Sequence, residues 1–288
     1  MLFCYTKLVF GELIKMISVN LTTTNSRVDI CSATVWSILN QELMPDKINV
    51  WVSKDAYLFD NGIQEIPLWV HAFNKIHNIV NFIFVENIGP YRKILPALME
   101  SKFDDTLVYC DDDVVYGKKW LKHLIEQYNK HNGEYAIAAR VRCKRKNFFG
   151  VYKSYNLYPI VNKYCLLNKD YIITGVGGCV INKTFVEKKF LEDKTYLTIA
   201  AMTDDLWLSK IFELNNIKIS VCTPALTEVH EITNIGEALS NNNTLIDKNN
   251  LVKKALKRII QVSMGYFGFS LSNNDVCMKK IERYFSGE

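Results

Sequence analysis

The chain contains no run of about 18 uncharged apolar residues, so the sequence predicts no membrane-spanning helix. Its apolar stretch at residues 1–14 is interrupted by Lys7 and Glu12, and no small-residue cleavage site follows, which argues against a signal peptide. The eight cysteines form no C-x-x-C pair, and several lie in apolar runs where a free thiol packs as a small hydrophobe. These absences favour a protein of the reducing cytoplasm.

The composition is that of a globular protein with a sizeable core. Of the 288 residues 49% are apolar, which suits one large α/β domain with or without an appendage. The formal charge of +5 is modest: it allows attraction to phosphates or anionic lipids but does not by itself indicate nucleic-acid binding. We therefore expect no nucleic-acid partner. The sequence shows no internal repeat.

Apolar runs alternate with helix-like segments along much of the chain. Strands are expected at residues 16–21, 47–53, 79–85, 106–110, 135–139, 171–181 and 217–221, helices at 28–39, 94–100, 120–128 and 206–214, and a helical or irregular connection at 66–76. This alternation predicts a mostly parallel sheet with right-handed crossovers, whose ligand crevice lies beyond the carboxyl ends of the strands. Residues 143–170 lose this periodicity, which predicts a long loop over the active face.

Three acids, Asp111, Asp112 and Asp113, follow the strand expected at 106–110. Adjacent carboxylates at a strand end repel one another and lose hydration, so they tend to take up protons or hold a divalent metal. Oxygen-only ligands favour Mg²⁺ or Mn²⁺, and a metal held by one or two carboxylates keeps positions open for the phosphates of a nucleotide. The alternative is a polar turn, since Asp is a common turn and N-cap residue.

Several further motifs stand in a fixed order around this triplet. They are a Thr/Asn turn at 22–27, Ser53-Lys54-Asp55, Gly89-Pro90-Tyr91-Arg92-Lys93, glycines at 175–178 and Thr203-Asp204-Asp205. Over residues 16–232 this order resembles nucleotide-sugar glycosyltransferases of the GT-A fold, and most closely the bacterial family 2-like enzymes. The resemblance implies an α/β fold, a Rossmann-like and mostly parallel central sheet flanked by helices, with a small C-terminal helical appendage.

The resemblance also implies roles for the nucleotide and the metal. The nucleotide-sugar, a UDP- or GDP-sugar, would be bound by Thr22, Thr23, Asn25, Arg27, Asp55, Arg92, Lys93, Asp111 and Asp112, and Mn²⁺ or Mg²⁺ by Asp113, Asp111 and His230. The metal would offset charge building on the departing diphosphate. Ordinary alternatives exist: Asp55 as a turn residue, Arg92 and Lys93 as a solvated pair, and His230 as a surface or core histidine.

Transfer to a hydroxyl needs a base, and the resemblance assigns that role to Asp205, with Asp204 as the alternative at the same helix start. The competing interpretation is helix capping, since acids there complement the helix dipole.

The resemblance also implies residues on the acceptor side. Gly177 and Gly178 would let backbone approach the sugar, and Arg140 and Arg142 would attract a phosphate-bearing acceptor. A ligand-free bulge and a solvated loop are the alternatives.

Three parts of the chain are expected: an N-terminal extension at 1–15, a catalytic domain at 16–232 with a nucleotide half (16–113) and an acceptor half (114–232), and a C-terminal helical segment at 233–288. In the last part, apolar and basic residues fall on opposite faces of a helix. The apolar face is Val252, Ala255, Leu256, Ile259 and Ile260, and the basic face is Lys253, Lys254, Lys257 and Arg258. This helix would pack on the core or lie peripherally on a membrane.

The sequence thus predicts a metal-dependent, inverting glycosyltransferase that uses a saccharide or lipid-linked acceptor in bacterial surface-polysaccharide (capsule or lipopolysaccharide) biosynthesis. It would work in the cytoplasm or on the inner face of the membrane. One rival is a sugar-phosphate nucleotidyltransferase, which normally needs a Gly-rich loop after its first strand, whereas the turn at 22–27 has no glycine. The other is a non-catalytic membrane-associated assembly protein, which retention of all the acids disfavours.

Overall fold

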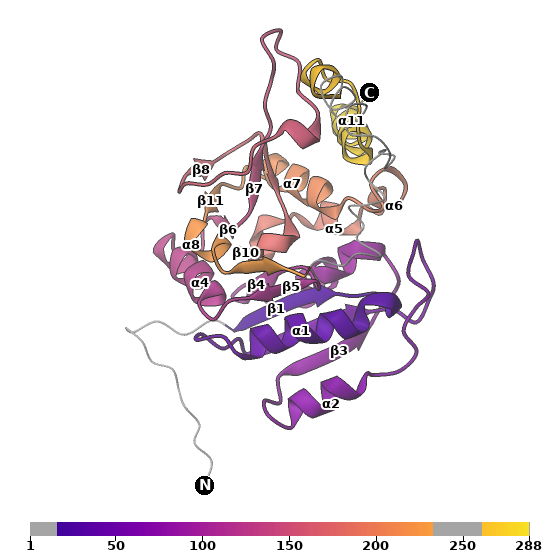
Figure 1. Ribbon diagram of the computed structural model, residues 1–288, viewed down its shortest axis with the longest axis vertical. Helices are drawn as coiled ribbons and strands as arrows, with labels where there is room; N and C mark the ends of the chain where they lie inside the picture. Colours follow the sequence, from indigo (N-terminus) through magenta and orange to yellow (C-terminus); the bar gives the residue numbers. More distant parts are fainter. Residues whose placement is uncertain (1–15, 233–260, 288) are drawn as a thin grey trace, which may run out of the picture.

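A computed structural model of the chain describes residues 16–232 and 261–287. Its centre is an eight-stranded sheet in the order β3-β2-β1-β4-β10-β6-β11-β8 (Figure 1). The strands are β1 (Ile17–Thr22), β2 (Lys47–Val52), β3 (Val80–Phe84), β4 (Thr106–Tyr109), β6 (Ala136–Ala138), β8 (Leu166–Leu167), β10 (Cys179–Ile181) and β11 (Ile219–Val221). Neighbours pair in parallel from β3 to β4 and between β6 and β11, whereas β10 and β8 run antiparallel to their neighbours. The predicted mostly parallel α/β fold is confirmed.

Two small antiparallel ribbons accompany the sheet and carry part of the site. They pair β5 (Val114–Tyr116) with β12 (Val229–Glu231), and β7 (Val141–Cys143) with β9 (Tyr171–Ile173). The α-helices are α1 (Val28–Leu39), α2 (Leu68–Asn74), α3 (Leu95–Glu100), α4 (Trp120–Lys130), α5 (Lys188–Glu192), α6 (Tyr196–Ile199), α7 (Asp204–Leu214), α8 (Thr223–Leu226) and α11 (Asn273–Ser286). The 3₁₀ turns are η1 (Asn25–Arg27), η2 (Gly89–Lys93), η3 (Tyr155–Leu157), η4 (Gly175–Gly177) and η5 (Lys183–Phe185).

The central strands are buried on both faces, which explains their continuous apolar runs. Val19, Val50 and Val108 are fully buried, and so are Ile137 and Val180 on the other half of the sheet. Helices and loops therefore cover both faces, and polar groups of the sheet must find partners inside the protein.

An asparagine ladder crosses three of these strands. Asn20, Asn49 and Asn81 occupy matching positions on β1, β2 and β3. Asn49 Nδ2 donates to Asn20 Oδ1, and Asn81 Nδ2 donates to Asn49 Oδ1; both hydrogen bonds are 2.9 Å long. Because a slip of one residue would leave buried amides without partners, the ladder fixes the register of the strands that end at the cleft.

The expected strand at 171–181 is instead two strands, and this corrects the prediction. The turn η4 separates β9 from β10, and Gly178 takes a left-handed φ of 81° at its end. A Cβ on Gly177 would lie 2.5 Å from the backbone nitrogen of Arg140, and one on Gly178 would lie 2.3 Å from the Trp120 ring. These two glycines are therefore required by packing within the protein.

The C-terminal helix α11 packs on α7. Trp207 of α7 lies 5.8 Å from Tyr284 and 5.1 Å from Phe285, measured between ring centroids. At its start, Ser272 and Asp275 form a capping box, and Asp275 also accepts from Ser154 Oγ at 2.8 Å. The amphipathic positions 252–260 lie outside the described residues. No helix among those that the structure describes is long and apolar enough to cross a bilayer.

Replacement of Gly178 by alanine is expected to destabilise the fold by about 2–4 kcal/mol, because it adds a clash with Trp120 to the cost of a left-handed backbone. Gly150 is the matched control, since its φ is 78° and nothing lies within 4 Å of its added Cβ. Gly150→Ala should cost only about 1 kcal/mol. Urea denaturation of both variants measures the difference, and equal losses would contradict the packing role.

Candidate active site

A cleft of about 460 Å³ opens beyond the carboxyl ends of β1 and β4. The predicted residues that line it are Thr22, Thr23, Arg27, Arg92, Lys93, Asp111, Asp112, Asp113, Arg140, Arg142, Asp204 and Asp205. Those that do not are Asn25, Asp55, Gly177, Gly178 and His230. Predicted residues from five separate places in the chain therefore meet at one edge of the sheet, beyond the carboxyl ends of its parallel strands.

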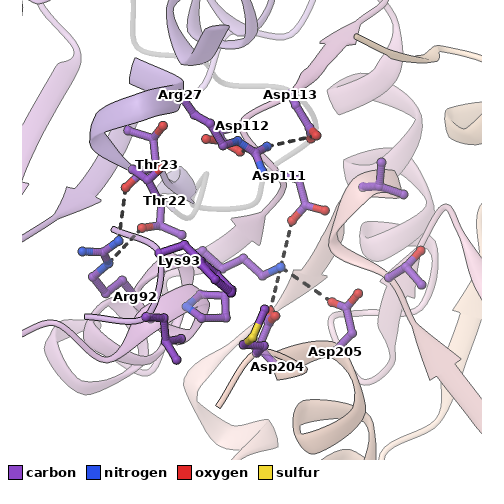
Figure 2. A pocket seen from close by; sticks show the side chains of 18 of the residues that line it. Thr22, Thr23, Arg27, Arg92, Lys93, Asp111, Asp112, Asp113, Asp204 and Asp205 are labelled. Atoms are coloured by element: carbon purple, nitrogen blue, oxygen red, sulfur yellow. Dashed lines mark hydrogen bonds and ion pairs between the residues drawn. The ribbon is translucent and has the colours of Figure 1, made fainter. Parts of the chain in front are cut away.

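Lys93 lies at the centre of the acidic residues of this cleft (Figure 2). Its Nζ is 2.8 Å from Asp111 Oδ1, 2.7 Å from Asp204 Oδ2 and 3.6 Å from Asp205 Oδ1. The Lys93 side chain is only 5% exposed. One buried ammonium thus joins the end of β4 to the start of α7, which are more than 90 residues apart in the sequence.

The local electrostatics follow from this burial. Burial alone would lower the pKa of Lys93, but attraction from Asp111, Asp204 and Asp205 outweighs it and the pKa lies well above 10.5. For Asp205, burial raises the pKa, Lys93 opposes the rise, and repulsion from Asp204 and Asp111 adds to it, which brings the pKa from 3.8 to about 7. A carboxyl with a pKa near neutrality can both hold and release a proton at physiological pH.

The two acids at the start of α7 have different surroundings. Asp204 is buried against Lys93, whereas the Asp205 side chain is 26% exposed and accepts from the backbone N–H of Gly175 at 3.0 Å. Thr203 occupies the N-cap position but its hydroxyl donates to the Ala200 carbonyl, so its side chain does not cap the helix. Asp205 is therefore the acid of this pair that is more open to the cleft.

Gly175 makes room for the Lys93 ion pair. A Cβ at this position would lie 2.4 Å from both Asp111 Oδ1 and Lys93 Nζ. The glycine-rich motif at 175–178 is thus needed beside the acids, although Gly177 and Gly178 lie behind the cleft against Arg140 and Trp120. Their predicted acceptor role has no support from this geometry.

Arg27 supplies the second cation at the triplet. Its Nη2 lies 2.5 Å from Asp112 Oδ1 and 2.9 Å from Asp113 Oδ2. Asp112 is buried, and burial raises its pKa to about 6 although Arg27 opposes the rise. Its carbonyl accepts from Thr34 Oγ1 at 2.8 Å, which anchors the turn to α1. Asp112 is thus a structural member of the triplet.

Asp111 and Asp113 are the triplet acids open to the cleft, each with a side chain that is 30% exposed. Their hard carboxylate oxygens fit Mg²⁺ or Mn²⁺. Among the residues that the structure describes, no group of three acidic, His or Cys side chains is arranged to hold a metal, so a bound metal would take further ligands from phosphate and water. His230 is exposed on β12 outside the cleft lining, whereas its neighbour Glu231 lines the cleft and pairs with Arg140 at 3.0 Å.

The side of the cleft next to the turn at 22–27 is organised by Asp60, which the sequence analysis missed. Asp60 is buried and its Oδ2 lies 2.8 Å from Arg92 Nη2, while its Oδ1 accepts from the backbone N–H of Asn25 at 3.2 Å. Arg92 also donates to Thr22 Oγ1 and to the Thr23 carbonyl, each at 3.2 Å. Asp55, the predicted residue, is exposed outside the cleft. No sequence signal distinguished Asp60, because Asn25 and Arg92, its partners, come from two distant segments.

The sequence and the fold are similar to those of known proteins. A family model described as glycosyl transferase family 2 matches residues 18–190, which is more than half of the chain. The chain belongs to this family. Its mostly parallel central sheet flanked by helices is the fold that the resemblance implied.

A search of curated proteins finds no match to this glycosyltransferase. Among solved structures, the crystal structure of S. aureus TarS 1-349 is similar to it, with 16% identical residues and a TM-score of 0.48. The matched part covers 72% of this chain and 58% of that chain, so it spans less than two thirds of the TarS fragment.

Lys93→Met is expected to lower the free energy of unfolding of the protein by about 3–5 kcal/mol near pH 8, because three carboxylates lose their shared cation. The loss should be smaller near about pH 5, because Asp205, whose pKa is about 7, is then protonated and no longer repels the other two acids. The control is Lys194→Met, since Lys194 is 59% exposed and pairs with an exposed Glu86. It should cost less than about 1 kcal/mol. Urea denaturation at both pH values, without divalent metal, measures this, and a pH-independent loss would contradict the assignment.

Proposed function

We propose that this glycosyltransferase moves a sugar from a nucleotide diphosphate donor to a hydroxyl of a saccharide or lipid-linked saccharide, with inversion and with Mn²⁺ or Mg²⁺ as cofactor. The observation that carries the proposal is the convergence of Asp111, Asp113 and Asp205 on one cleft. Lys93 pairs there with Asp111 and Asp205, and Arg27 pairs with Asp113. We keep residues 16–232 as the proposed catalytic domain. Family membership favours this function over the nucleotidyltransferase and the non-catalytic assembly protein.

In this proposal the nucleoside lies between the turn at 22–27 and the turn at 57–60. Leu58 and Phe59 are 45% and 63% exposed and belong to the cleft lining, so they offer apolar surface to a base. Arg92 and Asp60 hold the two turns together from beneath. Thr22, Thr23 and Arg92 thus shape the nucleoside pocket, and Asp60 takes the place that the sequence analysis gave to Asp55.

Asp111 and Asp113 would hold the metal, which supplies Lewis-acid stabilisation of the diphosphate as it leaves the sugar. Asp205 would accept the proton of the acceptor hydroxyl as the new glycosidic bond forms, since an alcohol is a poor nucleophile while it keeps that proton. Its greater exposure supports Asp205 over Asp204 for this role. Lys93 would position Asp205 and balance the charge of its carboxylate before proton transfer.

On the acceptor side, Arg140 and Arg142 face the cleft from β7 and the residues before it. Arg142 is held in place by donation to the Tyr158 carbonyl at 2.8 Å and lies 5.1 Å over the Tyr155 ring. Two guanidinium groups beside the cleft support an acceptor that carries phosphate, such as a lipid-linked diphosphate sugar. Surface-polysaccharide assembly in a bacterium is the proposed setting.

Asp113→Asn is expected to remove the metal-dependent part of donor binding while leaving the fold intact, because the side chain is partly exposed and its amide cannot replace the lost charge. The measurement is a thermal-shift series of UDP-, GDP-, CMP- and dTDP-sugars with and without Mn²⁺. The wild type should be stabilised by a donor with Mn²⁺. An Asp113→Asn variant that keeps the same metal-dependent shift would remove Asp113 from the metal site.

Asp205→Asn is expected to keep donor binding but to lower the rate of transfer by about 10²–10⁴-fold, because the amide cannot accept the proton. In the wild type the rate should rise with pH and level off above about 7, since the carboxyl must be ionised to act as base. Single-turnover transfer over a pH series tests both statements. Lost donor binding in Asp205→Asn, or a wild-type rate that falls over that pH range, would show that the base is misassigned.

A further inference from the structure

The loop at residues 144–153 carries aromatic side chains that no part of the catalytic proposal uses. Phe148 is 90% exposed and Phe149 is 70% exposed, and Val151 beside them is 47% exposed. In Figure 1 this loop, coloured rose, projects at the top of the molecule next to the yellow C-terminal helices. Large apolar side chains clustered at a projecting tip are unusual on a soluble surface, so they indicate an interaction site.

The tip is held in a defined shape. The two arms of the loop meet at an antiparallel bridge between Lys146 and Tyr152. At the turn, Asn147 Oδ1 accepts from the backbone N–H groups of Phe149 at 2.9 Å and Val151 at 3.0 Å. Asn147 is buried although both residues after it are exposed. These hydrogen bonds hold the loop in a shape that exposes both phenylalanines to solvent.

A second segment of the chain extends the apolar surface. Asn147 Nδ2 donates to the Tyr266 carbonyl at 3.0 Å, which fixes the loop to helical residues 261–266. The rings of Phe149 and Phe267 stack with centroids 6.3 Å apart. Phe267 and Phe269 are themselves 54% and 56% exposed. The name aromatic tip is used below for Phe148, Phe149, Val151, Phe267 and Phe269.

The two segments that form the aromatic tip carry basic residues and no acid, although Asp170 accepts from the Tyr152 hydroxyl at the base of the loop. Between residues 142 and 169 the sequence contains seven Lys or Arg residues and no Asp or Glu, and residues 261–274 carry no charged side chain. Arg145 and Lys146 are exposed beside the tip. The Nζ atoms of Lys146 and Lys153 lie 4.7 Å from the centroids of the Tyr152 and Tyr266 rings, respectively. Exposed aromatic residues flanked by Arg145 and Lys146 match an anionic lipid surface, where rings enter the headgroup region and cations pair with phosphates.

We propose that the aromatic tip docks this protein on a bilayer that contains anionic phospholipid. The projecting shape favours a bilayer over a folded protein partner, because two phenylalanines on a narrow loop can insert between headgroups but offer little area to a rigid surface. This surface is distinct from the amphipathic positions 252–260, and the inference does not depend on the identity of the donor or acceptor.

Docking at the tip would set the orientation of the cleft. The loop arises from β7, whose Arg142 lines the cleft, and returns into η3, whose Tyr155 and Asn156 also line it. The base of the loop is thus a wall of the acceptor side. A membrane held at the tip would lie next to the side of the cleft that faces a lipid-linked acceptor in the proposed function.

Vesicle co-sedimentation of the full chain tests the proposal. Vesicles of phosphatidylcholine alone are compared with vesicles in which about a third of the lipid is phosphatidylglycerol. The wild type should bind the anionic vesicles more tightly, and the binding should weaken as salt is raised. Phe148→Ser with Phe149→Ser should weaken it by about tenfold or more, since most of the inserted apolar surface is lost. Arg145→Gln with Lys146→Gln should weaken binding to anionic vesicles only.

Two matched controls separate the aromatic tip from surface properties in general. Phe103→Ser removes a phenylalanine that is 73% exposed before β4, and Lys188→Gln with Lys189→Gln removes two exposed charges from α5. Both should bind anionic vesicles as the wild type does. Because no donor or acceptor is present in this assay, its failure would leave the proposed chemistry untouched.

Three results would overturn the proposal. The first is a wild type that binds neither kind of vesicle, and the second is a double phenylalanine variant that binds as tightly as the wild type. The third is self-association, seen by light scattering, that disappears in the double variant while vesicles are ignored, which would assign the tip to a second copy of the chain. Thermal unfolding of each variant verifies that binding losses do not come from misfolding.

Discussion

The ion-pair cluster around Lys93 is the interaction on which the site depends. Asp111 follows β4, and Asp204 and Asp205 open α7, so without a shared cation three carboxylates would repel one another across the cleft. A buried ammonium loses hydration and is stable there only because all three acids face it. The same contacts fix the distance between the proposed metal-binding acid and the proposed base. Lys93 thereby stabilises the fold and also positions the acids of the proposed site.

A second buried ion pair orders the side of the cleft where we propose that the nucleoside binds. Arg92 and Asp60 are both buried, and they connect the turn after β1 to the turn at 57–60. Since Arg92 and Lys93 are neighbours on η2, one short 3₁₀ turn organises both halves of the cleft. Gly175 lies against the same ion pair, and a Cβ at this position would displace Lys93 and Asp111. The cleft is therefore largely preformed, which suits a site that must orient two substrates.

Much of the fold and part of the site follow from the sequence. Apolar runs ending in Thr22 and Asp111 predict parallel strands with their polar ends together, and the structure brings these ends to one cleft. Residues 171–181 show strand character around three glycines, but this pattern does not reveal that the turn η4 at the glycines divides the segment into two strands. The asparagine ladder was missed for a related reason: three separate Asn residues carry no local signal until the strands pair.

The sequence by itself determined the alternation of strands and helices, the family resemblance and the clustering of acids at strand and helix ends, because these are local properties of neighbouring residues. Only the tertiary structure decided that Lys93 joins the acids, that Asp60 and not Asp55 lies in the cleft, and that His230 lies outside it. It also placed Gly177 and Gly178 behind the cleft and the phenylalanines of the aromatic tip in solvent. Such outcomes depend on which distant segments meet, and on burial, which no local pattern encodes.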